Sequence, residues 1–114
     1  MKPLFNLLVV ASLTLGVNLA VAQEPEAPSV TVTPIKGPLY MLKGRGGTMV
    51  ASVGEDGILL IDADYAEYAP AHDAALKELA GSQSAPRFLL NTHWHGDHVG
   101  GNLYFSELGS VVIA

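Results

Sequence analysis

The chain has 114 residues, a net charge of −5 at neutral pH, a hydrophobic fraction of 49% and no cysteine. This length is enough for one small domain. An acidic chain without a basic run is not suited to binding nucleic acid, and the lack of cysteine excludes disulfides and thiolate metal ligands.

Residues 1–22 have the composition of a secretory signal peptide. Lys2 gives a basic start, an apolar stretch follows, and Ala20 and Ala22 fit the small-residue rule for cleavage. A transmembrane anchor is the competing interpretation, but two asparagines within the stretch weaken it. We therefore expect cleavage, export to a bacterial periplasm, and no stable membrane span in the mature protein.

The segment after the cleavage site is polar. Residues 23–29 contain two prolines and two glutamates, which predicts a flexible leader, and residues 30–114 are expected to form the folded unit. Because the signal peptide carries only Lys2 as a charged residue, its removal changes the net charge from −5 to −6. The oligomeric state is left open.

The first part of the folded unit predicts four strands that are separated by turns rich in glycine. Val30 and Val32 alternate with threonines, as in a half-buried strand. The last of the four is a continuous apolar run, which is typical of a strand buried on both faces. The predicted strands are Val30–Ile35, Leu39–Leu42, Thr48–Val53 and Ile58–Ile61.

Two aspartates follow the fourth strand, and a helix is predicted after them. Asp62 and Asp64 need partners if they are buried, and the simplest role for Asp64 is to cap the turn and helix that follow. Pro70 in a first turn and Gly81 at the end predict a helix over residues 68–80. His72 lies near the start of this helix, where we expect it to be solvated and not a ligand.

The remaining elements are a strand over residues 87–91, a helix that begins near residues 98–101, and a strand over residues 111–113. The first of these strands delivers a histidine-rich loop at its carboxyl end, where open α/β sheets place ligands. The helix carries Leu103, Phe105 and Leu108.

Three of the four histidines and one aspartate fall within six residues. His93, His95, Asp97 and His98 offer imidazole and carboxylate groups, the ligands that suit zinc when no thiolate is present. In an extended segment His93 and His95 point the same way and can share one metal ion. A lone histidine is more often a polar loop residue, but a cluster of this density predicts a metal site.

Two residues inside the cluster have less certain roles. Gly96 is expected to permit a tight turn that brings Asp97 and His98 towards the first two histidines. Trp94 is expected to point to the other side and to pack behind the loop, with the substrate entrance as its alternative position.

The pattern His-x-His-x-Asp-His over residues 93–98 resembles the signature of the metallo-β-lactamase superfamily. Thr92 before it, and Gly100, Gly101 and Asn102 after it, also match that pattern. Glutamate at position 95 would have indicated the di-iron flavoprotein branch, whereas His95 favours zinc. The resemblance covers about residues 30–114.

This resemblance implies a fold and a reaction. The fold class is α/β (α+β), the first half of an αββα sandwich. The reaction is zinc-dependent hydrolysis, in which a metal-activated hydroxide attacks an ester, thioester, lactone or lactam carbonyl of a small molecule. By resemblance His93 and His95 hold the first of two zinc ions, Asp97 and His98 hold the second, and Asp97 orients the nucleophile. An aspartate matching Asp62 supports the loop from below.

The superfamily completes its site with ligands from the second half of the fold. No histidine follows His98 here, and Glu107 is the only later acid, so the chain is expected to be a truncated fragment. Two alternatives to an active hydrolase therefore stay open. The chain is an inactive fragment, or it is a zinc-binding protein that depends on a partner chain.

Overall fold

The computed structural model describes residues 16, 20 and 22–114. The predicted signal peptide, residues 1–22, lies almost wholly outside the described residues. Residues 23–29 form neither helix nor strand and are exposed. Within the described part of the chain, no helix is both long and apolar enough to cross a membrane.

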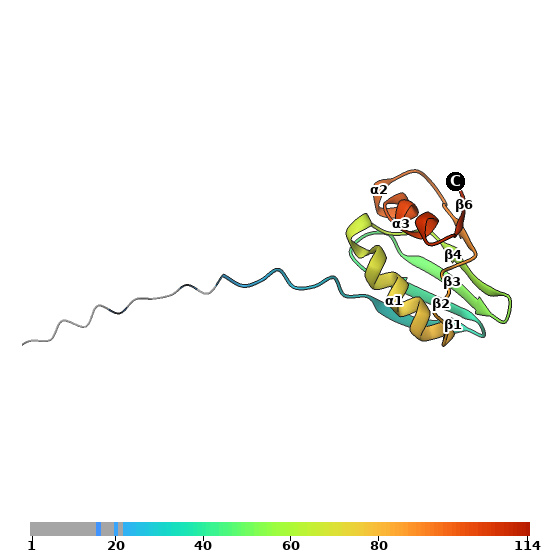
Figure 1. Cartoon of the computed structure of the whole chain (residues 1–114), viewed down its shortest axis with the longest axis horizontal. Helices are drawn as coiled ribbons and strands as arrows, with labels where there is room; N and C mark the ends of the chain where they lie inside the picture. Colours follow the sequence, from blue (N-terminus) through green and yellow to red (C-terminus); the bar gives the residue numbers. More distant parts are fainter. Residues whose placement is uncertain (1–15, 17–19, 21) are drawn as a thin grey trace, which may run out of the picture.

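Six strands form one sheet in the order in which they occur in the chain (Figure 1). The first four are antiparallel neighbours joined by short turns, and the last two continue the sheet in parallel with β4. The strands are β1 (Thr31–Lys36), β2 (Leu39–Lys43), β3 (Met49–Gly54), β4 (Gly57–Ile61), β5 (Phe88–Leu90) and β6 (Val111–Ile113). All predicted strands are present, with boundaries shifted by at most one residue.

The helices lie in the connections of the parallel part and pack on one face of the sheet (Figure 1). A 3-10 turn η1 (Ala66–Tyr68) leads into α1 (Ala69–Ala80), which crosses from β4 to β5. Gly81 ends α1 with a left-handed φ of 59°, a conformation that glycine adopts without steric cost. The second connection holds two short helices, α2 (Gly96–Val99) and α3 (Asn102–Glu107), where one helix was expected.

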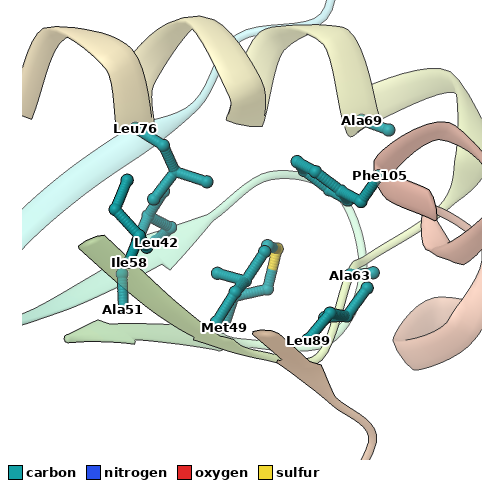
Figure 2. Packing of buried hydrophobic residues seen from close by; sticks show 10 residues of the cluster. Leu42, Met49, Ala51, Ile58, Ala63, Ala69, Leu76, Leu89 and Phe105 are labelled. Carbon is teal, nitrogen blue, oxygen red and sulfur yellow. The ribbon is translucent and has the colours of Figure 1, made fainter. Parts of the chain in front are cut away.

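The core lies between α1, α3 and the sheet. Leu76 of α1 and Phe105 of α3 fill the space between the helices and the sheet together with Met49 and Leu89, and all four are fully buried (Figure 2). The pleat places alternate residues of each strand on this face. Complete burial of such side chains is the main stabilising contribution to the fold, at about 25 cal/mol for each Å² of apolar surface removed from water.

The opposite face of the sheet also carries apolar side chains, but they are less buried. Strand register aligns them in two rows that run across β2 to β6. The first row is Met41, Val50, Ile61, Leu90 and Ile113, and the second, which is apolar except for Ser52, is Leu39, Ser52, Leu59, Phe88 and Val111. We call these two rows the open face. The expectation that β4 is buried on both faces is wrong for this structure, because Leu59 and Ile61 are only half-buried.

Candidate metal centre

The histidine-rich loop lies at the carboxyl edge of the parallel strands. β4 and β5 are parallel neighbours, so their carboxyl ends reach the same edge of the sheet. The segment after β4 carries Asp62 and Asp64, and the segment after β5 carries the residues from Thr92 to His98. This edge is where open α/β sheets place their functional groups.

Both aspartates have left-handed backbone conformations. Their φ angles are 65° for Asp62 and 54° for Asp64, and they are the only residues other than glycine in the described chain with positive φ. Aspartate tolerates this region better than most residues, but such conformations persist only where surrounding contacts hold them. The contacts are the hydrogen bonds of the two carboxylates, described below.

The turn that brings Asp97 and His98 back towards His93 is a short helix. His95 caps α2, and its carbonyl accepts the N–H groups of His98 and Val99 at 2.9 and 3.1 Å. Gly96 begins α2 and does not have positive φ. The predicted turn is present. The expectation that it needs the conformational freedom of glycine is wrong, because ordinary helical dihedral angles produce the turn.

The four predicted ligands are brought together. The ring centroid of His93 lies 4.0 Å from that of His98 and 4.8 Å from that of His95. Oδ2 of Asp97 lies 3.4 Å from Nε2 of His98. His93 and His95 are exposed, whereas His98 is largely covered.

Asp62 supports this loop from below with a nearly buried carboxylate. Its Oδ1 accepts the backbone N–H of Thr92, and its Oδ2 accepts the Thr92 hydroxyl, both at 2.8 Å. Nδ1 of His98 lies 2.8 Å from Oδ2 and donates to it, because a carboxylate can only accept. Burial opposes ionisation of Asp62, but the hydrogen bonds from Thr92 and His98 outweigh it and lower its pKa.

The same network reaches a second histidine. Oγ1 of Thr92 lies 2.9 Å from Nδ1 of His93. Since the single hydroxyl proton of Thr92 is donated to Asp62, Thr92 accepts the N–H of His93. Nδ1 is therefore the protonated nitrogen in both His93 and His98. Each ring then keeps the lone pair of Nε2 for another partner, which is the arrangement found in metal-binding histidines.

The donor set fits zinc in its chemistry. It consists of imidazole nitrogens and a carboxylate, and hydrogen bonds orient two of the imidazoles. Within residues 22–114 and the two other described positions, no three or more such side chains are already arranged at distances suited to one ion.

Two asparagines that the sequence did not single out as site residues fasten the loop to α3. The side-chain amides of Asn91 and Asn102 exchange two hydrogen bonds, of 3.0 and 2.7 Å. Asn91 also donates to the carbonyl of His98 at 3.1 Å. The one sequence feature that could have indicated this role is that the two asparagines stand at the two ends of the motif.

Asp64 and His72 have roles that differ from those predicted. His72 is fully buried, not solvated, and its Nε2 lies 2.8 Å from Oδ2 of the equally buried Asp64. Asp64 accepts the N–H of Tyr65, and it does not cap α1, whose N-cap position is held by Tyr68 without a side-chain hydrogen bond. His72 is buried because it lies one helical turn before Leu76, on the face of α1 that packs against the sheet.

Trp94 also differs from its expected place. It does not pack behind the loop, because it is 79% exposed. Its ring meets the ring of His95 edge-on at 4.7 Å. The contacts that hold the loop from below are instead the hydrogen bonds between Asp62 and Thr92.

Comparisons with known proteins agree with this geometry. The model of the metallo-β-lactamase superfamily matches residues 43–114. Among curated proteins, no sequence matches the chain.

Similar solved structures are metallo-β-lactamases. A subclass B3 enzyme from a soil metagenome library is 29% identical, with a TM-score of 0.64 over 80% of this chain and 33% of its own. An enzyme from Cronobacter sakazakii is 26% identical, with a TM-score of 0.68 over 77% and 34%. One from Novosphingobium pentaromativorans is 26% identical, with a TM-score of 0.66 over 75% and 32%.

This chain thus spans about a third of the length of these relatives. The matched region includes β3 to β6, all helices and the entire histidine-rich loop. The chain belongs to the metallo-β-lactamase superfamily.

Proposed function

We propose that the chain supplies the first metal-binding loop of an exported zinc-dependent hydrolase that cleaves an ester, thioester, lactone or lactam of a small molecule. The observation that carries the proposal is the network in which Asp62 and Thr92 orient His98 and His93. Membership of a hydrolase superfamily supports it.

In this proposal His93 and His95 hold one zinc ion, and Asp97 and His98 hold a second. Zinc supplies Lewis acidity, which lowers the pKa of water to ~7 and polarises a carbonyl. Side chains of the protein orient the ligands and the attacking water. Asp62 accepts the Nδ1 proton of His98 and Thr92 accepts that of His93, so that the lone pair of each Nε2 is left to bind a cation. The carboxylate of Asp97 orients the attacking water by accepting a hydrogen bond from it.

The test measures zinc content and hydrolysis on the native product isolated from its source cell. A panel of one ester, one thioester, one lactone and one lactam is assayed for the wild type and for His93→Ala. We expect hydrolysis of at least one class, and loss of both bound zinc and turnover in the variant. Gln83→Ala, in an exposed loop outside the motif, is the control and keeps both.

The proposal fails if no class is hydrolysed and His93→Ala leaves the zinc content unchanged. Zinc bound without turnover would instead support a non-catalytic or partner-dependent zinc protein. Because the chain spans about a third of its structural relatives, the intact mass of the native product is measured first. A mass well above that of residues 23–114 identifies a longer polypeptide as the one to assay.

Export to the periplasm belongs to the same proposal, and the composition of residues 1–22 supports it. Sequencing of the amino terminus of the native protein tests it. We expect the mature chain to begin at Gln23, and a protein that retains Met1 would contradict cleavage.

A further inference from the structure

A buried pair of hydrogen-bonded side chains lies next to the candidate metal centre but does not belong to it. Asp64 and His72 are both completely buried, and Nε2 of His72 lies 2.8 Å from Oδ2 of Asp64. Neither residue is among the predicted ligands. Burying such polar groups is costly unless they are paired, and the contacts of the pair show what it holds in place.

The carboxylate of Asp64 accepts four hydrogen bonds, two on each oxygen. Oδ2 accepts the N–H of Arg45 at 3.2 Å in addition to His72, and Oδ1 accepts the N–H groups of Gly46 and Tyr65 at 2.9 and 2.7 Å. A carboxylate has about four acceptor positions. Asp64 is thus saturated, and two of its donors belong to the backbone of one loop, residues 44–47, which we call the glycine loop.

His72 is committed to this carboxylate alone. Its Nδ1 is buried and has no hydrogen-bond partner among the described residues. Nε2 must be the donor to Asp64, since the carboxylate only accepts. The ring therefore serves to orient Asp64 from the side of α1, and it does so at the same oxygen that accepts the N–H of Arg45.

The glycine loop lies in tight contact with both the pair and the metal loop. A Cβ on Gly44 would meet Oδ2 of Asp64 and lie 3.0 Å from Nε2 of His72. A Cβ on Gly46 would lie 2.6 Å from Cβ of Asp97. These separations are shorter than van der Waals contact, so only glycine fits without displacement of a neighbour.

Gly47 completes the connection. Its N–H donates to the carbonyl of Asp97 at 3.1 Å. A Cβ at this position would lie 2.5 and 2.6 Å from Cε1 and Nε2 of His98. The glycine loop therefore borders the half of the motif formed by Asp97 and His98, on the side of the free Nε2.

We propose that Asp64 and His72 are positioning residues that fix the backbone of the glycine loop, and that this loop in turn holds Asp97 and His98 in the geometry needed for a cation. The effect on the cation rests on the proposed function, whereas the effect on the loop does not. The simpler view is that the pair only fastens α1 to the end of β4.

The experiment compares Asp64→Asn with wild type in the full chain. The first readout is hydrogen exchange of the amides of Arg45, Gly46 and Gly47. The second is the dissociation constant for zinc alone, measured by competition with a chromophoric chelator. We expect exchange to become about tenfold faster at these amides, and zinc binding to weaken about tenfold, as for other partners outside the ligand shell.

Asp73→Asn is the matched control. Asp73 is also a buried carboxylate, on the same helix as His72, but its partners are Lys77 and Tyr104 and not the glycine loop. The Asp73→Asn variant is expected to change the free energy of unfolding but to keep the amide exchange rates and the zinc dissociation constant of the wild type. His72→Gln keeps a side-chain N–H donor and is expected to retain a slower exchange than His72→Leu.

Gly47→Ala keeps the proposal testable where Asp64→Asn does not fold. It leaves the buried pair intact and places a methyl group against the ring of His98, so we expect weaker zinc binding by about tenfold. Gly54→Ala is its control, because a Cβ there would meet no atom within 4 Å.

Unchanged exchange at the three amides in Asp64→Asn, with a loss of stability like that of Asp73→Asn, would overturn the proposal. Faster exchange together with unaltered zinc affinity in both Asp64→Asn and Gly47→Ala would also overturn it, since the link to the metal loop would be absent. If wild type binds no zinc, the proposed function fails, and the exchange data alone still decide whether the pair positions the glycine loop.

Discussion

At the scale of single residues, Asp62 has the greatest influence on the candidate centre. One carboxylate accepts three hydrogen bonds, two from Thr92 and one from His98. It thereby determines which nitrogen of His98 carries the proton. Through the Thr92 hydroxyl it has the same effect on His93. A change at this position therefore affects two of the four candidate ligands without touching a ligand.

We predict that Asp62→Asn weakens zinc binding by about 10–100-fold, the usual effect of removing a carboxylate that orients a ligating histidine. Thr92→Val removes one hydrogen bond to Asp62 and is expected to lower the free energy of unfolding by about 1 kcal/mol. Chelator competition and urea denaturation measure the two effects. Asp56→Asn, on the exposed hairpin turn, serves as the control, and equal zinc affinity in both asparagine variants would contradict the prediction.

At the scale of elements, the metal loop depends on close packing at the start of α3. Gly101 lies where a Cβ would meet the carbonyl oxygen of Ala63 and lie 3.3 Å from Cβ of Ala69. Ala63 in turn donates its N–H to the carbonyl of His98 at 2.8 Å. The end of β4, the start of α1 and the metal loop thus meet at one glycine.

We predict that Gly101→Ala lowers the free energy of unfolding by about 1–3 kcal/mol, because the methyl group forces the backbone of Ala63 to move. Gly96→Ala is the matched control in the same motif. Its Cβ would lie 3.9 Å from Tyr65, and alanine favours a helix over glycine by up to about 1 kcal/mol. Urea denaturation of the two variants should give changes of opposite sign, and similar changes would show that the contact is not tight.

A second contact between elements joins α1 to α3. Oδ2 of Asp73 accepts hydrogen bonds from Lys77 at 2.7 Å and from the hydroxyl of Tyr104 at 3.1 Å. The hydrogen bond to Asp73 raises the pKa of Lys77. Burial, followed by the charge of Asp73, raises the pKa of Tyr104. Both shifts mean that the folded state holds these protons more tightly than the unfolded state.

Stability from these two groups is therefore present below their ordinary pKa values and is lost as the pH rises above about 10. We predict that wild type loses more stability between pH 9 and pH 11 than Asp73→Asn does, since the variant removes the carboxylate that raises both values. Thermal denaturation across this range measures the difference. Parallel curves for the two proteins would contradict the assignment.

At the scale of the whole molecule, the two faces of the sheet differ in burial. The face under α1 and α3 carries the fully buried core residues, whereas on the open face Val111 is 54% and Ile113 51% exposed. Contiguous exposed apolar side chains bind hydrophobic dyes.

We predict that replacing both Val111 and Ile113 with lysine lowers the fluorescence of bound anilinonaphthalene sulfonate by about half, because the substitutions interrupt the apolar rows. The change in unfolding free energy should stay within about 0.5 kcal/mol, as is usual at exposed sites. Leu103→Lys, on α3 and 68% exposed, is the control and should leave the fluorescence unaltered. A loss of dye binding as large in the control would contradict the role of the open face.

Local patterns in the sequence determined the order and type of the elements. Alternating valines, glycine turns and the proline at the start of α1 act over a few residues, so six strands, α1 and the helical region after the motif were predicted without the structure. The density of histidines around Asp97 identified the candidate ligands, and the match to the superfamily confirms the family that this motif indicated.

Only the tertiary structure decided which polar groups meet across the fold. Asp62 and His98 are 36 residues apart, and Asp64 and Gly46 are 18 apart, distances over which no periodic pattern carries information. His72 was misplaced because its partner, Asp64, lies in the connection before α1 and not on the helix, so that helical periodicity does not relate the two. Burial of a polar side chain depends on a partner that satisfies it, and such a partner is known only once the sheet has brought the loops to one edge.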